Sequence, residues 1–519
     1  MESSYTIGKG KLTHLPSQPR HIGAIEPKRA AHFGGPGRCI QRGVRMAKKN
    51  ELLARFGGKL TMIGFGSIGQ ALLPVLLRHF DLKPSDIKIV QTGEDRSGLA
   101  KRMGVELIPT RLEEGNFAAV LEPMLDQGDF LVNLSVNVSS LALIKLCRER
   151  GVFYLDTCNE PWDGRYDDPG LPPSRRSNYS LREELLAYRL DKRNGPTAVI
   201  TQGANPGVVS ALLKQALLNI AADTHAELES MPTSYEDWAA LAQQLEIKVI
   251  HIAERDTQVA GKRKERNEFV NTWSIQGFVD EGLQPAELGW GTHERHWPAD
   301  AARHGFGSDA AIYLSRPGIG TRVRSWTPLE GPYHGFLVTH AESISIADHL
   351  TLRKDGEVLY RPTVHYAYHP CDDAVLSLHE LAGKNWQLQH RQRIVRDEIV
   401  EGMDELGVLL MGNSKGVYWY GSRLTIEQAR ELAPANSATS LQVVAGILGG
   451  MLWALQNPDA GLVEPDDLDH RVVLEAALPY LGEVVGVYGD WTPLKDRCPL
   501  FKEEMDKDDP WQFLNFRVT

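Results

Sequence analysis

Cysteine is scarce in this sequence and is never clustered. The chain of 519 residues contains five cysteines: Cys39, Cys147, Cys158, Cys371 and Cys498. Because none of them forms a C-x-x-C pair, the sequence argues against a structural zinc site and against a disulfide framework. H-E-x-x-H is absent as well, and its nearest approximations are His293-Glu294 and the pair of His340 with Glu342. We therefore expect no metal site.

Long apolar runs are also missing. No stretch approaches the ~18 to 20 apolar residues of a membrane span, and residues 1–45 lack the apolar core of a secretory signal. These first residues are rich in Gly, Pro, Ser and Arg and show no helical or strand period, so we predict a disordered extension over residues 1–45. We expect a cytoplasmic protein that binds no membrane.

Positive charge is in short supply beyond this extension. The net charge at pH 7 is -10. Residues 1–45 hold eight Lys and Arg against Glu2 and Glu26, a net charge of +6, so residues 46–519 carry -16. An acidic body argues against a nucleic-acid partner and suits a cationic one. At ~100 to 200 residues per domain, the length predicts two or three domains.

A glycine-rich motif lies near the start of the acidic body. Residues 59–63 (KLTMI) form a short apolar strand pattern, and a helical pattern runs from Gln70 to Phe80, in which Pro74 predicts a kink. A strand, G-x-G-x-x-G and a helix in this order predict a dinucleotide site, with the pyrophosphate at the helix N-terminus. The residues between strand and helix that we expect to bind the cofactor are Gly64, Gly66, Ser67, Ile68 and Gly69.

The identity of the dinucleotide is less clear from the next strand, residues 87–90. The residue about twenty positions after the last glycine is usually an Asp or Glu that accepts a hydrogen bond from the ribose. Gln91 stands at that place. An amide can still bond a hydroxyl, so we include Gln91 in the cofactor site, and nearby Arg96 leaves NADP open beside NAD.

Further strands and helices alternate after this point. Strand patterns cover residues 130–135, 152–156 and 197–201, and helical patterns cover residues 140–150 and 208–218. This alternation predicts an α/β fold with a Rossmann-type, doubly wound parallel sheet. Ligands of such sheets lie at the carboxyl ends of the strands. The residues expected there are Asn133 and Ser135 on the cofactor side, and Glu160 and Asn205.

The regular alternation ends after Ala222. From there to about Gly421 the pattern is mixed and rich in Gly, Trp, His and carboxylates, which predicts an inserted second α+β domain on the substrate side. We expect a dinucleotide-binding domain over residues 58–205 plus part of 430–475. The second domain should cover residues 206–430 plus the C-terminal segment.

Nine sequence blocks then identify a family. They are M-I-G-F-G-S-I-G (62–69), V-N-L-S-V (132–136), G-A-N-P-G (203–207), H-I-A-E-R-D-T-Q (251–258), V-N-T-W-S (270–274), E-G-L-Q-P-A-E-L-G-W-G-T-H-E-R (281–295), L-V-T-H-A-E-S-I-S-I-A-D (337–348), H-Y-A-Y-H-P-C (365–371) and D-P-W-Q-F (509–513). With these blocks in order, the chain from about Met62 to Phe516 resembles the bacterial homospermidine synthases, relatives of the saccharopine dehydrogenases.

This resemblance implies an NAD-dependent aminobutyl-transferring synthase that uses putrescine, with spermidine as a further candidate substrate. NAD would be tightly bound and regenerated in each cycle. It takes a hydride from one putrescine, the second putrescine attacks the resulting imine, ammonia leaves, and the hydride returns to give homospermidine. The resemblance also implies a homodimer whose interface lies in the second domain.

The resemblance assigns roles to residues that match its blocks. Trp273 would hold the cationic intermediate against its π face. Glu254 and Glu281 would bind amines, and His340 with Glu342 would handle protons. Glu160 and Asn205 would orient the reacting amine near the nicotinamide. Such a pocket suits this reaction. Putrescine is a dication, and carboxylates must offset the free energy that its desolvation costs.

One position departs from the family pattern, because Asn137 stands where we expect an acidic residue. The loss of that negative charge could weaken the attraction of amines at the pocket rim. Two other functions stay open: a saccharopine-type NAD(P)-dependent dehydrogenase, which would need cations facing a substrate carboxylate, and a non-catalytic NAD-binding scaffold.

Overall fold

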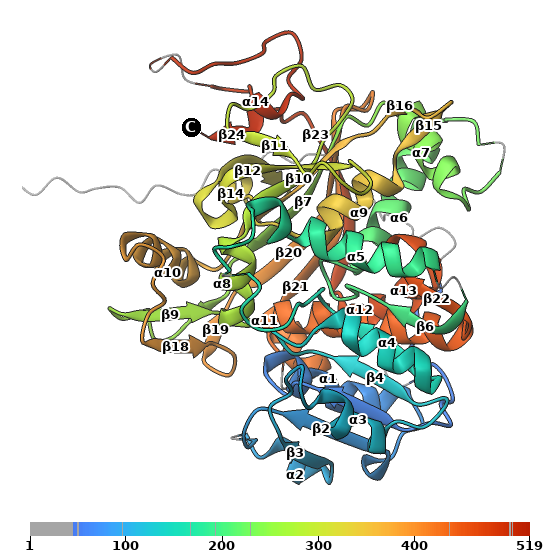
Figure 1. Cartoon of the computed structure of the whole chain (residues 1–519). Coiled ribbons are helices and arrows are strands. Elements are labelled where there is room, and N and C mark those ends of the chain that lie inside the picture. Colours follow the sequence, from blue (N-terminus) through green and yellow to red (C-terminus); the bar gives the residue numbers. More distant parts are fainter. Residues whose placement is uncertain are drawn as a thin grey trace, which may run out of the picture. The chain divides into compact units, whose positions relative to one another are not determined.

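A computed structural model describes residues 45–48, 51–95, 97–166, 168–191, 194–228, 230–434, 436–497, 500 and 502–518. The predicted disordered extension and Arg96 lie outside these residues, Arg45 excepted. Two large sheets dominate the described part, one wholly parallel and one mixed (Figure 1). The predicted α/β class with a doubly wound parallel sheet is therefore confirmed.

The parallel sheet has seven strands in the order β22-β6-β5-β4-β1-β2-β3. Their bounds are β1 Leu60–Ile63, β2 Ile87–Gln91, β3 Glu106–Pro109, β4 Phe130–Asn133, β5 Phe153–Asp156, β6 Gly195–Val199 and β22 Ala460–Val463. The chain crosses from one side of β1 to the other between β3 and β4, so the strand order reverses beside β1. Ligands of open α/β sheets bind at such a reversal. The late strand β22 completes the sheet at the edge beside β6.

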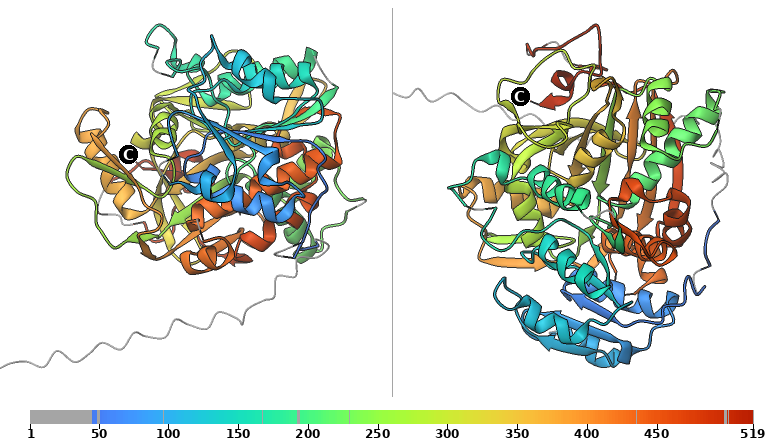
Figure 2. Two further views of the ribbon diagram at one scale, coloured as in Figure 1. Left: turned by 90° about the horizontal axis from the view of Figure 1, so that it is seen from below. Right: turned by 45° about the vertical axis from the view of Figure 1, so that its right-hand side comes forward.

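Helices cover both faces of this sheet. Their bounds are α1 Ser67–His79, α2 Leu99–Met103, α3 Phe117–Leu121, α4 Ser140–Arg150, α5 Asn178–Asp191, α6 Val208–Asp223, α12 Ala438–Gln456 and α13 His470–Ala477. Helix α1 begins three residues earlier than the sequence suggests, directly after Gly66, and it continues through Pro74 as one helix. Helices α6, α12 and α13 pack on one another between the two large sheets (Figures 1 and 2).

The second sheet has eleven strands, with β11-β12-β10-β17-β7-β20-β21-β23 as its main order. Its strands are β7 Val249–Asp256, β10 Pro285–Gly289, β11 Ala301–Arg303, β12 Ala311–Pro317, β13 Arg322–Thr327, β14 Gly331–Phe336, β17 Thr363–His369, β20 Met403–Met411, β21 Val417–Thr425, β23 Glu483–Gly489 and β24 Arg517–Val518. Every residue of the central strand β7 is buried, Glu254 and Asp256 included. Such buried carboxyl groups need hydrogen-bond partners. Those of Glu254 lie in the candidate site, whereas Asp256 accepts hydrogen bonds from Gln258 and Thr272.

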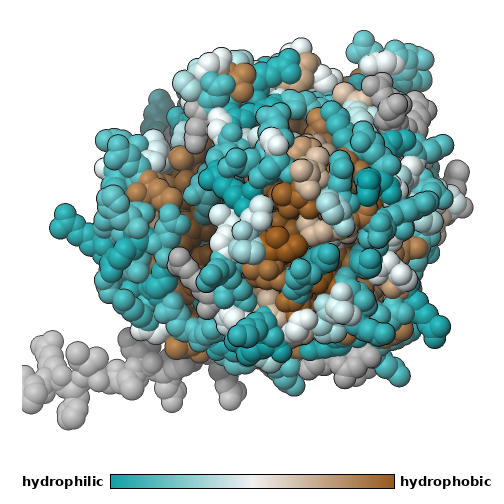
Figure 3. All heavy atoms as spheres, turned by 60° about the horizontal axis from the view of Figure 1, so that its bottom comes forward, coloured by the Kyte–Doolittle hydropathy of each residue, from teal (hydrophilic) through white to brown (hydrophobic). Residues whose placement is uncertain are grey.

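The remaining elements are short. They are α7 Tyr235–Gln244, α8 Ile275–Leu283, α9 Ala341–His349, α10 Asp372–Gly383, α11 Ile426–Leu432 and α14 Phe513–Phe516, with the two-stranded pairs β15 Leu352–Lys354 with β16 Glu357–Tyr360, β9 Glu268–Asn271 with β18 Arg391–Ile394, and β8 Val259–Ala260 with β19 Ile399–Glu401. Viewed from the lower side of Figure 1, the surface is mostly hydrophilic, and apolar side chains gather in a central recess (Figure 3).

Helix α12 corrects one expectation from the sequence. Its 19 residues are apolar enough, at a hydropathy of 1.6, to cross a membrane by length and composition. Most of that stretch is buried inside the fold, against α1, α13 and the strands β5 and β6. The apolar run is therefore explained by its position between the two sheets.

Two histidines at the centre of the mixed sheet predict acid sensitivity. His251 on β7 and His365 on β17 are register partners, both fully buried, with ring centroids 4.0 Å apart. Burial lowers the pKa of His365 to about 4 and holds the pKa of His251 well below its ordinary value. The unfolded chain binds protons below about pH 6.5, whereas the folded chain does not. The free energy of unfolding should therefore fall as the pH drops from about 6.5 towards 4.

The variant His365→Phe removes one of these sites. Between about pH 6 and pH 4.5 its free energy of unfolding should fall less steeply than that of the wild type, by up to about 1.4 kcal/mol per pH unit. Urea titrations at several pH values measure this slope. His379→Phe, at an exposed position of α10, serves as the control and should leave the slope unchanged. Equal slopes for wild type and His365→Phe would contradict the assignment.

Candidate functional site

Each glycine of the loop between β1 and α1 meets a different physical demand. Gly64 has φ +88°, and a Cβ there would lie 2.7 Å from the carbonyl oxygen of Leu134. A Cβ on Gly69 would lie 2.6 Å from the oxygen of Gly64, so this glycine allows helix and loop to pack closely. A Cβ on Gly66 would meet nothing within 4 Å, which leaves open space at the N-terminus of α1. This combination suits a backbone that approaches a pyrophosphate.

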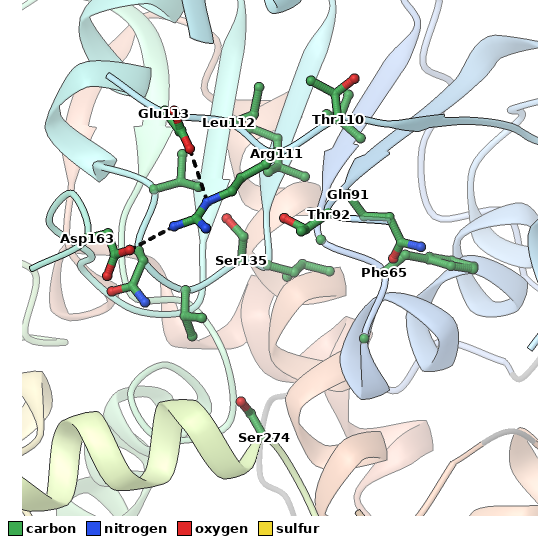
Figure 4. Close-up of a pocket in the computed structure, with 18 of the residues that line it drawn as sticks. Phe65, Gln91, Thr92, Thr110, Arg111, Leu112, Glu113, Ser135, Asp163 and Ser274 are labelled. Atoms are coloured by element: carbon green, nitrogen blue, oxygen red, sulfur yellow. Dashed lines mark hydrogen bonds and ion pairs between the residues drawn. The ribbon is translucent and has the colours of Figure 1, made fainter. Parts of the chain in front are cut away.

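A cavity of about 640 Å³ lies over this loop, at the carboxyl ends of β1, β2 and β4 (Figure 4). Its volume lies within the range of ~300 to 1,000 Å³ common for ligand sites. Six of the residues predicted to bind the cofactor line it: Gly64, Gly66, Ser67, Ile68, Gln91 and Ser135. Asn133 and Gly69 are not among the lining residues. The buried Asn133 instead accepts a hydrogen bond from the Ser135 hydroxyl at 2.6 Å.

The rim of this cavity is acidic. Glu113, Glu114 and Asp163 line it, and Arg111 is the one Lys or Arg among the lining residues that the structure describes. Its Nε lies 3.3 Å from Glu113 and its Nη2 lies 2.8 Å from Asp163 (Figure 4). Gln91 donates from Nε2 to the carbonyl of Gly93 at 3.2 Å. The cation at the rim is thus already paired with two carboxylates.

A second, smaller pocket of about 130 Å³ adjoins the cofactor cavity, because Ile68, Leu134, Ser135, Val136 and Ser274 line both. It lies where the parallel sheet meets the mixed sheet. Six residues predicted for catalysis line it together: Glu160, Asn205, Glu254, Trp273, Glu281 and His340. Glu342 does not line the pocket but touches His340 from behind.

Short local segments from both sheets bring these side chains together. Glu160 and Asn205 follow β5 and β6, at the carboxyl edge where the sequence places them. Trp273 lies just before the N-cap of α8 and Glu281 lies within the helix, and both line the pocket together with Gly277. Glu254 projects from the buried strand β7. The pocket therefore exists only where the two sheets meet.

His340 joins two carboxylates. Its Nδ1 lies 3.1 Å from Glu342 Oε1, and its Nε2 lies 3.2 Å from Glu281 Oε2. Burial by itself opposes a charged imidazole, but the two carboxylates outweigh it and hold the pKa of His340 well above its usual range. His340 is thus held protonated between two carboxyl groups. This group offers carboxyl oxygens to a cation and can exchange a proton with it.

Glu254 and Glu160 form the other acidic wall. Glu254 Oε2 accepts hydrogen bonds from the Tyr366 hydroxyl at 2.5 Å and from Asn205 Nδ2 at 3.0 Å. Glu160 accepts from the backbone N–H of Asn137 at 3.1 Å. Burial raises the pKa of each carboxyl to about 8. Both groups are therefore largely neutral at pH 7 and can ionise when a cation arrives.

Trp273 is held by neighbouring aromatic residues. Its Nε1 donates to the Tyr368 hydroxyl at 3.1 Å, and its ring lies 5.2 Å from that of Phe278. The indole is only partly buried and lines the pocket, which is consistent with a binding surface more than with a core position.

Sequence reasoning missed the two tyrosines of the H-Y-A-Y-H block. Tyr366 and Tyr368 lie on the same face of β17, stacked with ring centroids 5.1 Å apart. Tyr366 binds Glu254 and Tyr368 binds Trp273, so both fix pocket residues. Their alternation beside the strand of Glu254 is the signal that could have revealed them. The ion pairs of Arg111 at the cofactor rim had no comparable signal.

The predicted absence of a metal site stays a prediction. Within the described residues, no group of three His, Cys, Asp or Glu side chains is arranged to hold a metal ion. His293 and Glu294 have structural partners: His293 Nε2 contacts the carbonyl of Trp511, and Glu294 accepts from Thr363 and from the N–H of Phe513.

Comparison with known proteins gives consistent results along the chain. Residues 60–199 match the family model of the saccharopine dehydrogenase NADP binding domain, and residues 203–490 match that of the saccharopine dehydrogenase C-terminal domain. The homospermidine synthase of Blastochloris viridis is 54% identical over 468 residues, which cover 89% of this chain and 98% of the relative. That of Mesorhizobium japonicum is 48% identical over 481 residues, 91% of this chain and 99% of the relative.

A solved structure extends this similarity to three dimensions. The crystal structure of the homospermidine synthase of Legionella pneumophila in complex with NAD superposes with a TM-score of 0.85. The two sequences are 50% identical, and the match covers 91% of this chain and all of that one.

The charge arrangement around His340 can be tested directly. Glu281→Gln removes one of the two carboxylates that raise the pKa of His340, so that pKa should fall. NMR of protein labelled with ¹⁵N-histidine follows the titration. Asp280→Asn, the adjacent position on α8, is the matched control and should lower it much less. An unchanged His340 pKa in Glu281→Gln would contradict the arrangement.

Proposed function

The chain belongs to the homospermidine synthases of the saccharopine dehydrogenase family, and from this membership we propose that it condenses two molecules of putrescine into homospermidine and ammonia with a bound NAD. One structural observation carries the proposal. A small pocket walled by three carboxyl groups, a histidine and an indole adjoins the dinucleotide cavity, and a fourth carboxyl group, that of Glu342, contacts the histidine from behind.

The walls of the pocket suit a diamine. Among the described residues, neither Lys nor Arg lines it, and His340 is the one basic side chain. Aliphatic amines titrate near ~10.4, so putrescine arrives as a dication whose desolvation must be offset. Glu281 with the His340 group supplies one negative site, and Glu254 with Glu160 supplies further sites once they ionise. The carboxyl groups of the pocket therefore release protons when the ammonium groups of the substrate bind.

The same residues manage the protons of the reaction. The amine that reacts must be neutral, so a carboxylate has to accept its proton. Glu160 and Glu254, with pKa values of about 8, are suited to accept and return protons near neutral pH. Asn205 bonds Glu254 and orients it, and His340 exchanges protons with Glu281 and Glu342. Trp273 offers its face to the positive charge of the substrate imine without a nucleophilic oxygen.

The loop of Gly64, Gly66 and Ser67 would hold the cofactor, with Gln91 and Ser135 along the cavity. NAD supplies a hydride acceptor and, after the condensation, the hydride donor, so the reaction has no net redox change. We propose NAD over NADP because the rim is acidic and Arg111 is already paired, which disfavours an additional phosphate. The solved relative in complex with NAD supports this choice.

The two other candidate functions find less support. A saccharopine-type dehydrogenase needs a cation for the carboxylate of its amino-acid substrate, and the described part of the pocket offers none apart from His340, which is already shared by two glutamates. A non-catalytic scaffold would have no use for carboxylates buried next to the cofactor. The resemblance to bacterial synthases further supports a homodimer acting in the cytoplasm.

Product analysis tests the function. Purified protein incubated with putrescine and a catalytic amount of NAD should form homospermidine and ammonia without stoichiometric NADH. Chromatography of the amines and absorbance of NADH measure both. Stoichiometric NADH, or no product, would refute the synthase activity. In the same assay NADP should support far less product, and faster turnover with NADP would overturn the cofactor assignment.

Two substitutions distinguish the binding of charge by the π face of Trp273 from the space that its side chain fills. Trp273→Ala removes the π face and should lower kcat/KM for putrescine roughly 2- to 30-fold, the range expected of one cation-π contact, while NAD still binds. Trp273→Phe keeps a π face and should lose less. Steady-state kinetics and NAD titration give both values. Equal kcat/KM for the two variants would show that the indole fills space and does not hold charge.

A further inference from the structure

The two-stranded pair of β9 and β18 reaches both halves of the site. β9 leads directly into Trp273 and Ser274, and Ser274 lines both cavities. β18 ends at Ile394, which lines the cofactor cavity. The strands are parallel, with Ile394 opposite Asn271. This ribbon, residues 268–271 with 391–394, projects beside α8 and α10 (Figure 1).

A chain of hydrogen bonds connects the end of the ribbon to the glycine loop. Arg396, two residues beyond β18, donates from Nη1 to Gln70 Oε1 at 2.9 Å. Gln70, in the first turn of α1, donates from Nε2 to the carbonyl of Phe65 at 3.0 Å. Phe65 stands between the first two glycines and is almost fully buried. Both bonds use a single orientation of the Gln70 amide, because a flipped amide would lose both.

We propose that Gln70 and Arg396 are positioning residues for the cofactor: Arg396 orients the Gln70 amide, and Gln70 holds the Phe65 carbonyl so that the glycine loop keeps its cofactor-binding conformation. This inference rests on the proposed dinucleotide site and adds two residues to it. Neither residue touches the pocket of Trp273.

Arg396 is well placed for this role because its own backbone is fixed. Arg430 on α11 donates from Nη2 to the carbonyls of Arg396, Asp397 and Ile399, at 3.0, 3.2 and 2.7 Å. The turn after β18 is thus anchored on α11, and the Arg396 side chain extends from a fixed base to α1. A hydrogen bond from a charged donor is stronger than one between neutral groups.

The connection also links the cofactor and substrate sides. Displacement of the glycine loop would break the bond to Gln70 and release the end of the ribbon, whose other strand leads into Trp273. Binding on either side should therefore favour the ordered ribbon, and such coupling is reciprocal by thermodynamic necessity.

The rate of NADH dissociation tests the proposal. Protein loaded with NADH is mixed with excess NAD, and the loss of bound NADH fluorescence gives the rate. Arg396→Ala should raise this rate about tenfold, a loss of about 1.4 kcal/mol. Gln70→Met, which neither donates nor accepts, should do the same, and the double variant should be no worse than either single variant. Arg396→Lys, which keeps a donor, should restore part of the effect.

Arg391→Ala is the matched control, because Arg391 lies at the start of β18, shortly before Arg396, and pairs with Glu265 away from the cavity. The proposed connection through Arg396 and Gln70 is refuted if Arg396→Ala and Gln70→Met release NADH no faster than Arg391→Ala, or if the effects of the two substitutions add. A wild type that binds no dinucleotide would instead refute the proposed function. In that case hydrogen exchange of the amides of residues 65–68 in the free protein tests the connection through Arg396 and Gln70. Exchange should be faster in Arg396→Ala than in Arg391→Ala.

Discussion

The burial of carboxyl groups next to the dinucleotide cavity is the constraint on which the site depends. Glu160, Glu254 and Glu342 are almost fully buried, and no Lys or Arg in the described residues reaches the pocket to neutralise them. An isolated buried carboxylate costs several kcal/mol and normally takes up a proton instead. Here Glu160 and Glu254 hold protons near neutral pH, and Glu342 is paired with the positively charged His340. The pocket remains short of positive charge, which an ammonium group of the proposed substrate would supply.

The architecture follows from the need to place this acidic pocket beside a hydride carrier. The parallel sheet presents its carboxyl edge, with the glycine loop, Glu160 and Asn205, towards the mixed sheet. The second domain contributes β7 and β17, whose Glu254 and Tyr366 are hydrogen-bonded to each other, and Trp273, which lies just before α8. Neither sheet builds the pocket alone. Helices α6, α12 and α13 fill the space between the sheets and fix their separation.

Much of this arrangement could be predicted from local sequence patterns. The strand, glycine loop and helix, the alternation that follows, and the position of Glu160 and Asn205 after strands are properties of short segments, which topology rules convert into a shared edge. The blocks that resemble a known family predicted the pocket residues of the mixed sheet, which no periodicity could bring together. Gly69 and Asn133 support the loop and do not line its cavity. Gly69 allows the helix to pack closely against the loop, and Asn133 accepts a hydrogen bond from the Ser135 hydroxyl.

Contacts between distant segments could not be predicted in this way. Tyr366 and Tyr368 matter because their strand pairs with that of Glu254, more than a hundred residues earlier, and Arg396 matters because its turn meets α1. Helix α12 looks like a membrane span in composition, and only its place between two sheets shows why it is apolar.

In the proposed mechanism the pocket releases protons when ammonium groups bind. Calorimetric titration of putrescine into protein loaded with NADH, which cannot accept a hydride, counts the protons exchanged at pH 7 when it is repeated in buffers of different ionisation enthalpy. Net release is predicted, because Glu254 and Glu160 are largely protonated in the free pocket and ionise against the diamine. Binding without proton exchange, or with net proton uptake, would contradict the account.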